Sequence, residues 1–227
     1  MRIVGVPNPL GSPVVEFTVG HGEHPVGSLF QRGYIPIRPL TATLIRGDIV
    51  VTYLVRSRAP WDRSPRTRTF SHEEPHTTQV PAIRQRVGAY AVVTSSLGVL
   101  GTVHSSLTGA PGTWALPGGG VDDDEAPSDA VIREVFEESG QHVTIDRILA
   151  VDSDHWIGRS TTGVLEDFHA LRIIYAATCE TPSEPVVHDR GGSTERAGWV
   201  PLQTWNRLHW TISSRTVLAT FCPRARA

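Results

Sequence analysis

The sequence predicts an α/β protein that is preceded by a β-rich N-terminal extension. Apolar runs of strand length occur at Val87–Val93 and Val99–Val103, on either side of a short polar turn. A glycine-rich loop then leads into a predicted helix, and further apolar runs at Val143–Val151 and Leu171–Ala177 predict two more strands after it. Strands on both sides of a helix indicate the α/β class.

The N-terminal extension contains short apolar runs that glycines and prolines separate. Its clearest predicted element is a hairpin, in which Thr41–Ile45 and Ile49–Val55 form the strands and Arg46-Gly47-Asp48 forms the turn. We expect the whole chain to be organised into four segments: a β-rich segment 1–57, a linker or long loop 58–81 rich in proline and arginine, a domain 82–212 and a C-terminal tail 213–227.

The expected linker contains His72-Glu73-Glu74-Pro75-His76, which matches the pattern of two helical histidines that bind zinc in metalloproteases. Pro75 disfavours helix at Glu74, so His72 and His76 cannot share one helical face. We therefore predict no zinc-protease site in this segment.

Composition excludes several classes of function. The 227 residues contain 21 Lys+Arg and 23 Asp+Glu, a near-neutral balance that disfavours nucleic acid polymers as partners. All basic residues are arginines, so lysine chemistry is excluded. No segment approaches the roughly 20 apolar residues of a membrane span, and the only cysteines are Cys179 and Cys222. We expect a cytoplasmic protein that contacts no membrane.

The predicted helix starts near Pro127, where a missing amide hydrogen is no loss, and stops at Gly140. At about 100° per residue, four apolar side chains fall within one arc and predict a stripe that faces the core. These residues are Val131, Ile132, Val135 and Phe136.

A second face of this helix carries Glu134, Glu137 and Glu138. Carboxylates three and four positions apart repel one another, whereas a hard divalent cation would reverse the sign of that interaction. The sequence therefore predicts a site for Mg²⁺, with Mn²⁺ as the alternative. Arg133 is expected to pair with Glu125 and to fasten the preceding loop to the helix.

The loop before the helix contains Gly118, Gly119 and Gly120. Glycine lacks a Cβ, so the backbone can turn tightly and approach bulky phosphate oxygens. We therefore expect these three residues to bind the phosphates of a substrate.

The loop and helix together resemble the Nudix box. That pattern is Gly, five residues, Glu, seven residues, Arg-Glu, an aliphatic residue, any residue, Glu-Glu, any residue, Gly and an aliphatic residue. The matching positions are Gly119, Glu125, Arg133, Glu134, Val135, Glu137, Glu138 and Gly140. Gln141 replaces the last aliphatic residue, a departure that bears on packing after the helix and not on metal binding.

The resemblance covers about residues 84–210 and implies an α/β/α sandwich with a mixed β-sheet. It implies divalent-metal-dependent hydrolysis of the diphosphate linkage in a nucleoside di- or triphosphate derivative. Glu134, Glu137 and Glu138 become the metal ligands, and Arg133, Glu137 and Glu138 the catalytic residues. Gly119, Glu125, Arg133 and Gly140 support the site.

Several points stay open at this stage. The general base is Glu137, Glu138, Glu166 or Glu195, with a box glutamate favoured. Trp156 is a candidate for stacking on a base, equally explained by packing, and His155 and His169 are left out of the predicted site because a lone histidine more often has a local structural role. The alternative function is a nucleotide-sensing module without turnover. The N-terminal extension is compatible with a homodimer.

Overall fold

The structure is a computed structural model that describes residues 1–64, 79–160, 162–189 and 191–222. The chain divides into two compact units. The first unit comprises Met1–Gly88, Gly120–Pro127 and Ile148–Ile174, and the second comprises Ala89–Gly119, Ser128–Arg147 and Tyr175–Ala227. The domain boundaries expected from the sequence stay a prediction.

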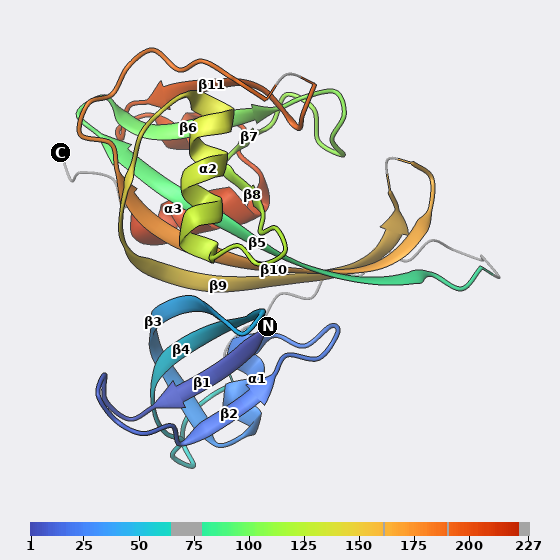
Figure 1. Ribbon diagram of the computed structural model, residues 1–227, viewed down its shortest axis with the longest axis vertical. Coiled ribbons are helices and arrows are strands. Elements are labelled where there is room, and N and C mark those ends of the chain that lie inside the picture. Colours follow the sequence, from blue (N-terminus) through green and yellow to red (C-terminus); the bar gives the residue numbers. More distant parts are fainter. Residues whose placement is uncertain (65–78, 161, 190, 223–227) are drawn as a thin grey trace. The chain divides into compact units, whose positions relative to one another are not determined.

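The N-terminal part of the first unit is a four-stranded sheet with one short helix (Figure 1). The strand order is β2-β1-β4-β3, and the sheet is mixed because β1 pairs parallel with β4 but antiparallel with β2. The elements are β1 (Arg2–Val6), β2 (Val15–Thr18), α1 (Pro25–Gln31), β3 (Tyr34–Ile45) and β4 (Asp48–Ser57). His24 caps α1, because its Nδ1 accepts a hydrogen bond from the Val26 amide.

The predicted hairpin is confirmed in β3 and β4, but these strands pair antiparallel up to Ile45 and Asp48, so Asp48 belongs to β4 and not to the turn. Arg46 and Gly47 form the turn with φ values of 53° and 82°. Two consecutive positive φ values match the twist of two-residue hairpins, and glycine adopts them most readily. Strand β3 is an edge strand, which allows it to contain Pro36 and Pro39.

The second sheet has the order β11-β6-β5-β10-β9, with β7 paired to β6 and β8 paired to β5. Four of its strands, β5, β8, β9 and β10, contribute residues to both units. The elements are β5 (Ala82–Ser95), β6 (Gly98–His104), β7 (Trp114–Ala115), β8 (Gly118–Gly120), β9 (Thr144–Arg159), β10 (Leu165–Thr178) and β11 (Thr194–Val200). The predicted strands at Val87–Val93 and Val99–Val103 are confirmed within β5 and β6.

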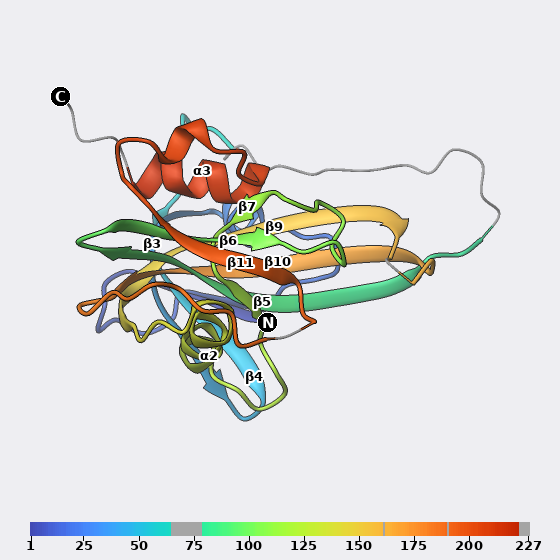
Figure 2. The same cartoon turned by 90° about the horizontal axis from the view of Figure 1, so that it is seen from above.

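Within the second unit, helices α2 (Pro127–Ser139) and α3 (Ile212–Phe221) lie on opposite faces of the sheet (Figure 2). This layering confirms the α/β/α class. Residues 213–221, expected in a C-terminal tail, are helical instead, because Val217 and Leu218 are buried and Thr211 caps the helix by accepting from the Ser214 amide. A short 3₁₀ helix, η1 (Trp205–Arg207), precedes α3.

The predicted core stripe of α2 is correct for two residues and wrong for two. Val131 and Val135 are fully buried, whereas Ile132 and Phe136 are 39% and 38% exposed. The Phe136 ring packs instead against the rings of His142 and His188, at centroid distances of 5.0 Å each. The apolar arc of this helix is therefore wider than the surface that the sheet covers.

Two sequence features lie partly or wholly outside the described residues. Most of the expected linker 58–81 and all of the His72–His76 pattern fall in residues 65–78.

Among the described residues, no helix is long and apolar enough to cross a membrane.

Candidate functional site

The predicted metal-binding residues all lie on α2, which ends where the sequence predicted. The amide of Gly140 donates to the carbonyl of Phe136 at 2.7 Å, and Gly140 has a φ of 69°. This left-handed residue after the last turn closes the helix in the way that glycine favours. The C-terminal half of α2 therefore presents Glu134, Glu137 and Glu138 from a well-defined helical end.

Glu138 is the most constrained of the three glutamates. Its side chain is buried, with 5% of the residue exposed. The Gly118 amide donates to its Oε2 at 2.9 Å, and the Thr194 hydroxyl donates to its Oε1. These two hydrogen bonds fix the carboxylate between the glycine loop and strand β11.

The electrostatic environment of Glu138 disfavours its charged form. Burial raises the pKa of Glu138 to about 7, and the charges of Glu134 and Asp189 add to the rise. The hydrogen bonds from Thr194 and Gly118 act in the opposite direction. A cation bound at this position would favour the charged form of Glu138, because its positive charge would compensate for the hydration that the buried carboxylate has lost.

Glu134 and Glu137 share a single arginine. Arg133 Nη1 lies 3.1 Å from Glu134 Oε1 and 3.2 Å from Glu137 Oε2. The Glu134 side chain is 17% exposed and that of Glu137 is 42% exposed. Arg133 thus offsets the repulsion between two carboxylates of the predicted site, while its expected pairing with Glu125 stays a prediction.

The glycine loop packs directly against this helix face. A Cβ at Gly119 would overlap the carboxylate of Glu134, so the residue type at position 119 decides where that carboxylate lies. A Cβ at Gly118 would overlap the backbone carbonyl of Ala89, and Gly118 has a φ of 139°. At Gly120 the neighbour is the end of the Arg86 side chain. Gly118 is therefore required by its close approach to fixed backbone, whereas at Gly119 and Gly120 the neighbours are the ends of side chains.

The acidic loop between the glycines and the helix is ordered locally. Glu125 Oε2 accepts from the Asp122 amide at 3.0 Å, and Asp124 adopts a left-handed φ of 60°. Aspartate tolerates this conformation better than most residues. Glu125 therefore stabilises the turn at Asp122, and its supporting role in the site stays a prediction.

The donor set of α2 fits Mg²⁺ or Mn²⁺. It consists of carboxylate oxygens on one helix face, which are the ligands that hard divalent cations prefer. The buried Glu138 carboxylate and the space that a Cβ at Gly119 would fill against Glu134 both agree with an oxygen-lined cation site.

Glu166 and Glu195, the two candidate general bases outside the Nudix box, have different neighbours from the glutamates of α2. Glu166, on β10, has a side chain only 13% exposed, and its Oε1 lies 3.4 Å from Arg84 Nη1. Glu195 is an exposed residue of β11, next to Thr194. Trp156 packs on Phe168 with ring centroids 4.7 Å apart.

Gln141 packs well although it replaces an aliphatic residue. It is 2% exposed, its Nε2 donates to the Ser139 carbonyl and the Ser183 hydroxyl at 3.1 Å each, and its Oε1 accepts from the Ser183 amide at 3.0 Å. A buried amide with both ends satisfied carries little penalty. The packing after the helix is therefore maintained by polar contacts.

Sequence reasoning missed two features. Thr194 was not identified as a partner of Glu138, because a contact between strand and helix leaves no local sequence signal. A group formed by His21, His155 and Asp167 was also missed, and its three potential ligand atoms all lie within 4.8 Å of one another. The only local signal was the pair of glycines that flank His21.

Comparison with known proteins identifies the family. The NUDIX domain model matches residues 84–221, which is more than half of the chain. An uncharacterized Nudix hydrolase from Rhodococcus erythropolis is 28% identical over 197 residues, covering 82% of this chain and 98% of that protein. Since this match is longer than residues 84–227, it includes part of the N-terminal extension.

Two further relatives match shorter stretches. An RNA pyrophosphohydrolase from Agrobacterium fabrum is 44% identical over 54 residues, which is 24% of this chain and 30% of that protein. A MutT Nudix hydrolase structure from Burkholderia pseudomallei is 26% identical, with a TM-score of 0.44, and the match covers 61% of this chain and 98% of that one. The chain belongs to the Nudix family and is a Nudix-type pyrophosphohydrolase.

Proposed function

We propose that this protein hydrolyses the diphosphate linkage of a nucleoside di- or triphosphate derivative in a reaction that depends on Mg²⁺. The observation that carries the proposal is the arrangement around Glu138, a buried carboxylate held by the Gly118 amide and the Thr194 hydroxyl on the glutamate face of α2. A buried acidic group of this kind has a clear use as a cation ligand.

Glu134, Glu137 and Glu138 are the residues that would hold the ion. Mg²⁺, when bound, neutralises charge on a pyrophosphate and lowers the pKa of a bound water. Gly119 keeps the Glu134 carboxylate in place, and Arg133 holds the Glu137 carboxylate on the same side of the helix. Gly118, Gly119 and Gly120 leave room for phosphate oxygens beside the backbone.

A box glutamate takes the proton from the attacking water in this proposal. Glu137 is the most accessible of the three, with a side chain 42% exposed, so it can reach water while Glu138 stays fixed by its two donors. Glu166 is paired with Arg84 and Glu195 points from an exposed strand position, which makes both less suited to the role.

The proposed substrate class is supported by the family and by the names of two relatives. The Agrobacterium fabrum relative is an RNA pyrophosphohydrolase, and a Streptomyces ambofaciens relative is MutT-like. The first name supports hydrolysis of a pyrophosphate linkage, and we propose a small nucleotide as the substrate because the near-neutral charge of the chain disfavours a nucleic acid polymer. The homodimer and the cytoplasmic location stay predictions.

The test is hydrolysis across a panel of nucleoside triphosphates, oxidised purine triphosphates, nucleotide sugars and dinucleotides, with and without Mg²⁺. Products are identified by mass spectrometry in ¹⁸O-labelled water, which reports the phosphorus that is attacked. Glu138→Gln should abolish turnover, because a neutral amide cannot replace a charged ligand. Glu180→Gln, the same change at an exposed glutamate, is the matched control and should leave turnover unchanged.

Each result has a defined meaning. Metal-dependent cleavage that only Glu138→Gln removes would support the proposal and identify the linkage. Nucleotide binding without turnover would replace it with the alternative, a nucleotide-sensing module. Cleavage that persists in Glu138→Gln would contradict the role assigned to the box.

A further inference from the structure

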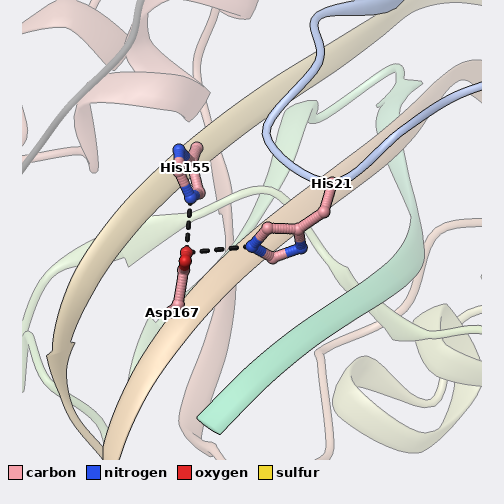
Figure 3. Close-up of side chains that lie close together, drawn as sticks. All are labelled: His21, His155 and Asp167. Atoms are coloured by element: carbon pink, nitrogen blue, oxygen red, sulfur yellow. Dashed lines mark hydrogen bonds and ion pairs between the residues drawn. The ribbon is translucent and has the colours of Figure 1, made fainter. Parts of the chain in front are cut away.

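Three side chains from distant parts of the sequence point toward one another in the first unit (Figure 3). His155 comes from β9, Asp167 from the neighbouring strand β10, and His21 from the segment between β2 and α1. The Asp167 Oδ1 atom lies 2.9 Å from His21 Nε2 and 2.5 Å from His155 Nε2. Two imidazole nitrogens thus converge on a single carboxylate oxygen.

The surrounding structure holds His21 in place. Gly22 has a φ of 74°, and a Cβ there would lie 3.3 Å from the His155 ring. The Gly22 amide donates to His169 Nδ1 at 3.1 Å, and His169 is fully buried with its Nε2 2.9 Å from the Ser153 hydroxyl. His169 therefore anchors the backbone beside His21 and belongs to the supporting structure, not to the group itself.

The hydrogen bonds within this group leave one polar atom unused. His21 Nδ1 is buried and has no hydrogen-bond partner among the described residues. An imidazole that binds a metal ion through Nε2 carries its proton on Nδ1, so the bound ion would have to offset the cost of this buried donor.

The distances suit a metal ion after a small adjustment. Zn²⁺ binds imidazole nitrogen and carboxylate oxygen at about 2.0–2.2 Å, so tetrahedral ligands stand roughly 3.3 Å apart. The two observed contacts, 2.9 and 2.5 Å, are shorter than this by less than 1 Å. Each histidine would bind as a neutral imidazole through Nε2, with its proton on Nδ1, and slight separation of the three side chains would open the space for an ion.

We propose that His21, His155 and Asp167 form a binding site for a divalent transition-metal ion of the Zn²⁺ class. Two nitrogens and one oxygen match the preference of Zn²⁺, whereas Mg²⁺ prefers oxygen ligands alone. The side chains are 24%, 27% and 21% exposed, so an ion can enter from solvent and keep a water molecule as its fourth ligand. The site uses none of the box glutamates.

The bound ion would tie the N-terminal extension to strands β9 and β10. Residues 21 and 167 are 146 positions apart, and residues 155 and 167 are 12 apart. A crosslink over so long a loop stabilises the folded state, because the unfolded chain has no preformed site. The ion would therefore crosslink the N-terminal extension to strands β9 and β10 within the first unit.

The experiment uses the full chain, stripped of metal with EDTA and then placed in saturating Mg²⁺, which occupies oxygen-only sites. Zn²⁺ binding is measured by isothermal titration calorimetry, and Co²⁺ binding by its visible absorption bands. We expect one equivalent of Zn²⁺, and about 100-fold weaker binding in His155→Gln and in the conservative Asp167→Asn variant. His209→Gln, a change at an exposed histidine elsewhere, is the control and should bind as the unchanged protein does.

Two further measurements separate binding from misfolding and from the hydrolytic site. Circular dichroism without metal shows whether each variant folds, and Zn²⁺ should slow amide exchange at residues 19–24 only in the unchanged protein and in His209→Gln. Glu137→Gln should keep Zn²⁺ binding. The proposal fails if no Zn²⁺ binds in saturating Mg²⁺, if folded His155→Gln and Asp167→Asn bind as tightly as the unchanged protein, or if Glu137→Gln abolishes binding.

Discussion

The Thr194 hydroxyl donates a hydrogen bond to the Glu138 carboxylate, although the two residues lie 56 positions apart in the chain. Both residues are 5% exposed, so little water competes for this contact. Strand β11 therefore contributes to the glutamate face of α2 through one hydroxyl group.

Replacement of Thr194 by valine tests that contribution. The change keeps the shape of the side chain but removes a donor that lowers the pKa of Glu138, so the carboxyl should ionise less readily. We expect kcat/KM to fall by about tenfold near neutral pH and to recover as pH rises. Thr194→Ser keeps the hydroxyl and should restore the profile, and an equal loss at every pH would show that the defect is only structural.

Two neighbouring glycines should respond differently to alanine. Gly119→Ala would displace the movable Glu134 carboxylate, so Mg²⁺-dependent turnover should fall while Tm changes by less than about 3 °C. In Gly118→Ala the new Cβ would overlap the fixed Ala89 carbonyl, and residue 118 would have to keep a φ of 139°. The free energy of unfolding should therefore fall by roughly 2 kcal/mol or more. Thermal denaturation and steady-state kinetics distinguish the two effects. Equal loss of stability in both variants would contradict this distinction.

The raised pKa of Glu138 has a consequence for the metal-free protein. Between pH 4.5 and about 7 the folded state retains a proton that the unfolded chain has lost, so stability is fully present below pH 4.5 and declines as pH rises to about 7. The decline attributable to this group is at most roughly 3 kcal/mol. Urea unfolding in EDTA at a series of pH values measures it, and Glu138→Gln should remove this part of the slope. An unchanged slope in the variant would assign the effect to other groups.

The two cysteines should be unreactive in the folded protein. Cys179 and Cys222 are free, 2% and 9% exposed, and burial raises the pKa of both thiols. Reaction with Ellman's reagent should be slow in native buffer and rapid for both thiols in guanidinium. Ser96→Cys, in an exposed turn, should react at once and serves as the positive control. Rapid native reaction of two thiols would show that these segments open readily.

Local patterns in the sequence predicted local structure well. The Arg46-Gly47 turn follows from glycine chemistry, and the α2 boundaries follow from Pro127 and Gly140, because each signal lies within a few residues of its effect. The carboxylate face of α2 could be predicted for the same reason, since helical spacing places Glu134 and Glu138 together.

Contacts between distant segments could not be predicted in this way. Ile132 and Phe136 had the spacing of core residues, but the width of the surface that covers α2 depends on how the sheet packs. Thr194 and His21 gained their partners only when separate strands and loops came together. A single sequence holds no signal for such pairs, because the residues adjacent to each partner in the chain do not indicate a distant contact.

Gln141 has a consequence for how this region can change during evolution. Its side chain exchanges hydrogen bonds with the hydroxyl and amide of Ser183, 42 positions away. An aliphatic residue introduced at position 141 alone would leave the amide and hydroxyl of the exposed Ser183 without their present partner, whereas the same exchange accompanied by a new residue at position 183 could pack as in other Nudix boxes. The two positions are therefore expected to be inherited as a pair, and substitution at one should mark substitution at the other across this branch of the family.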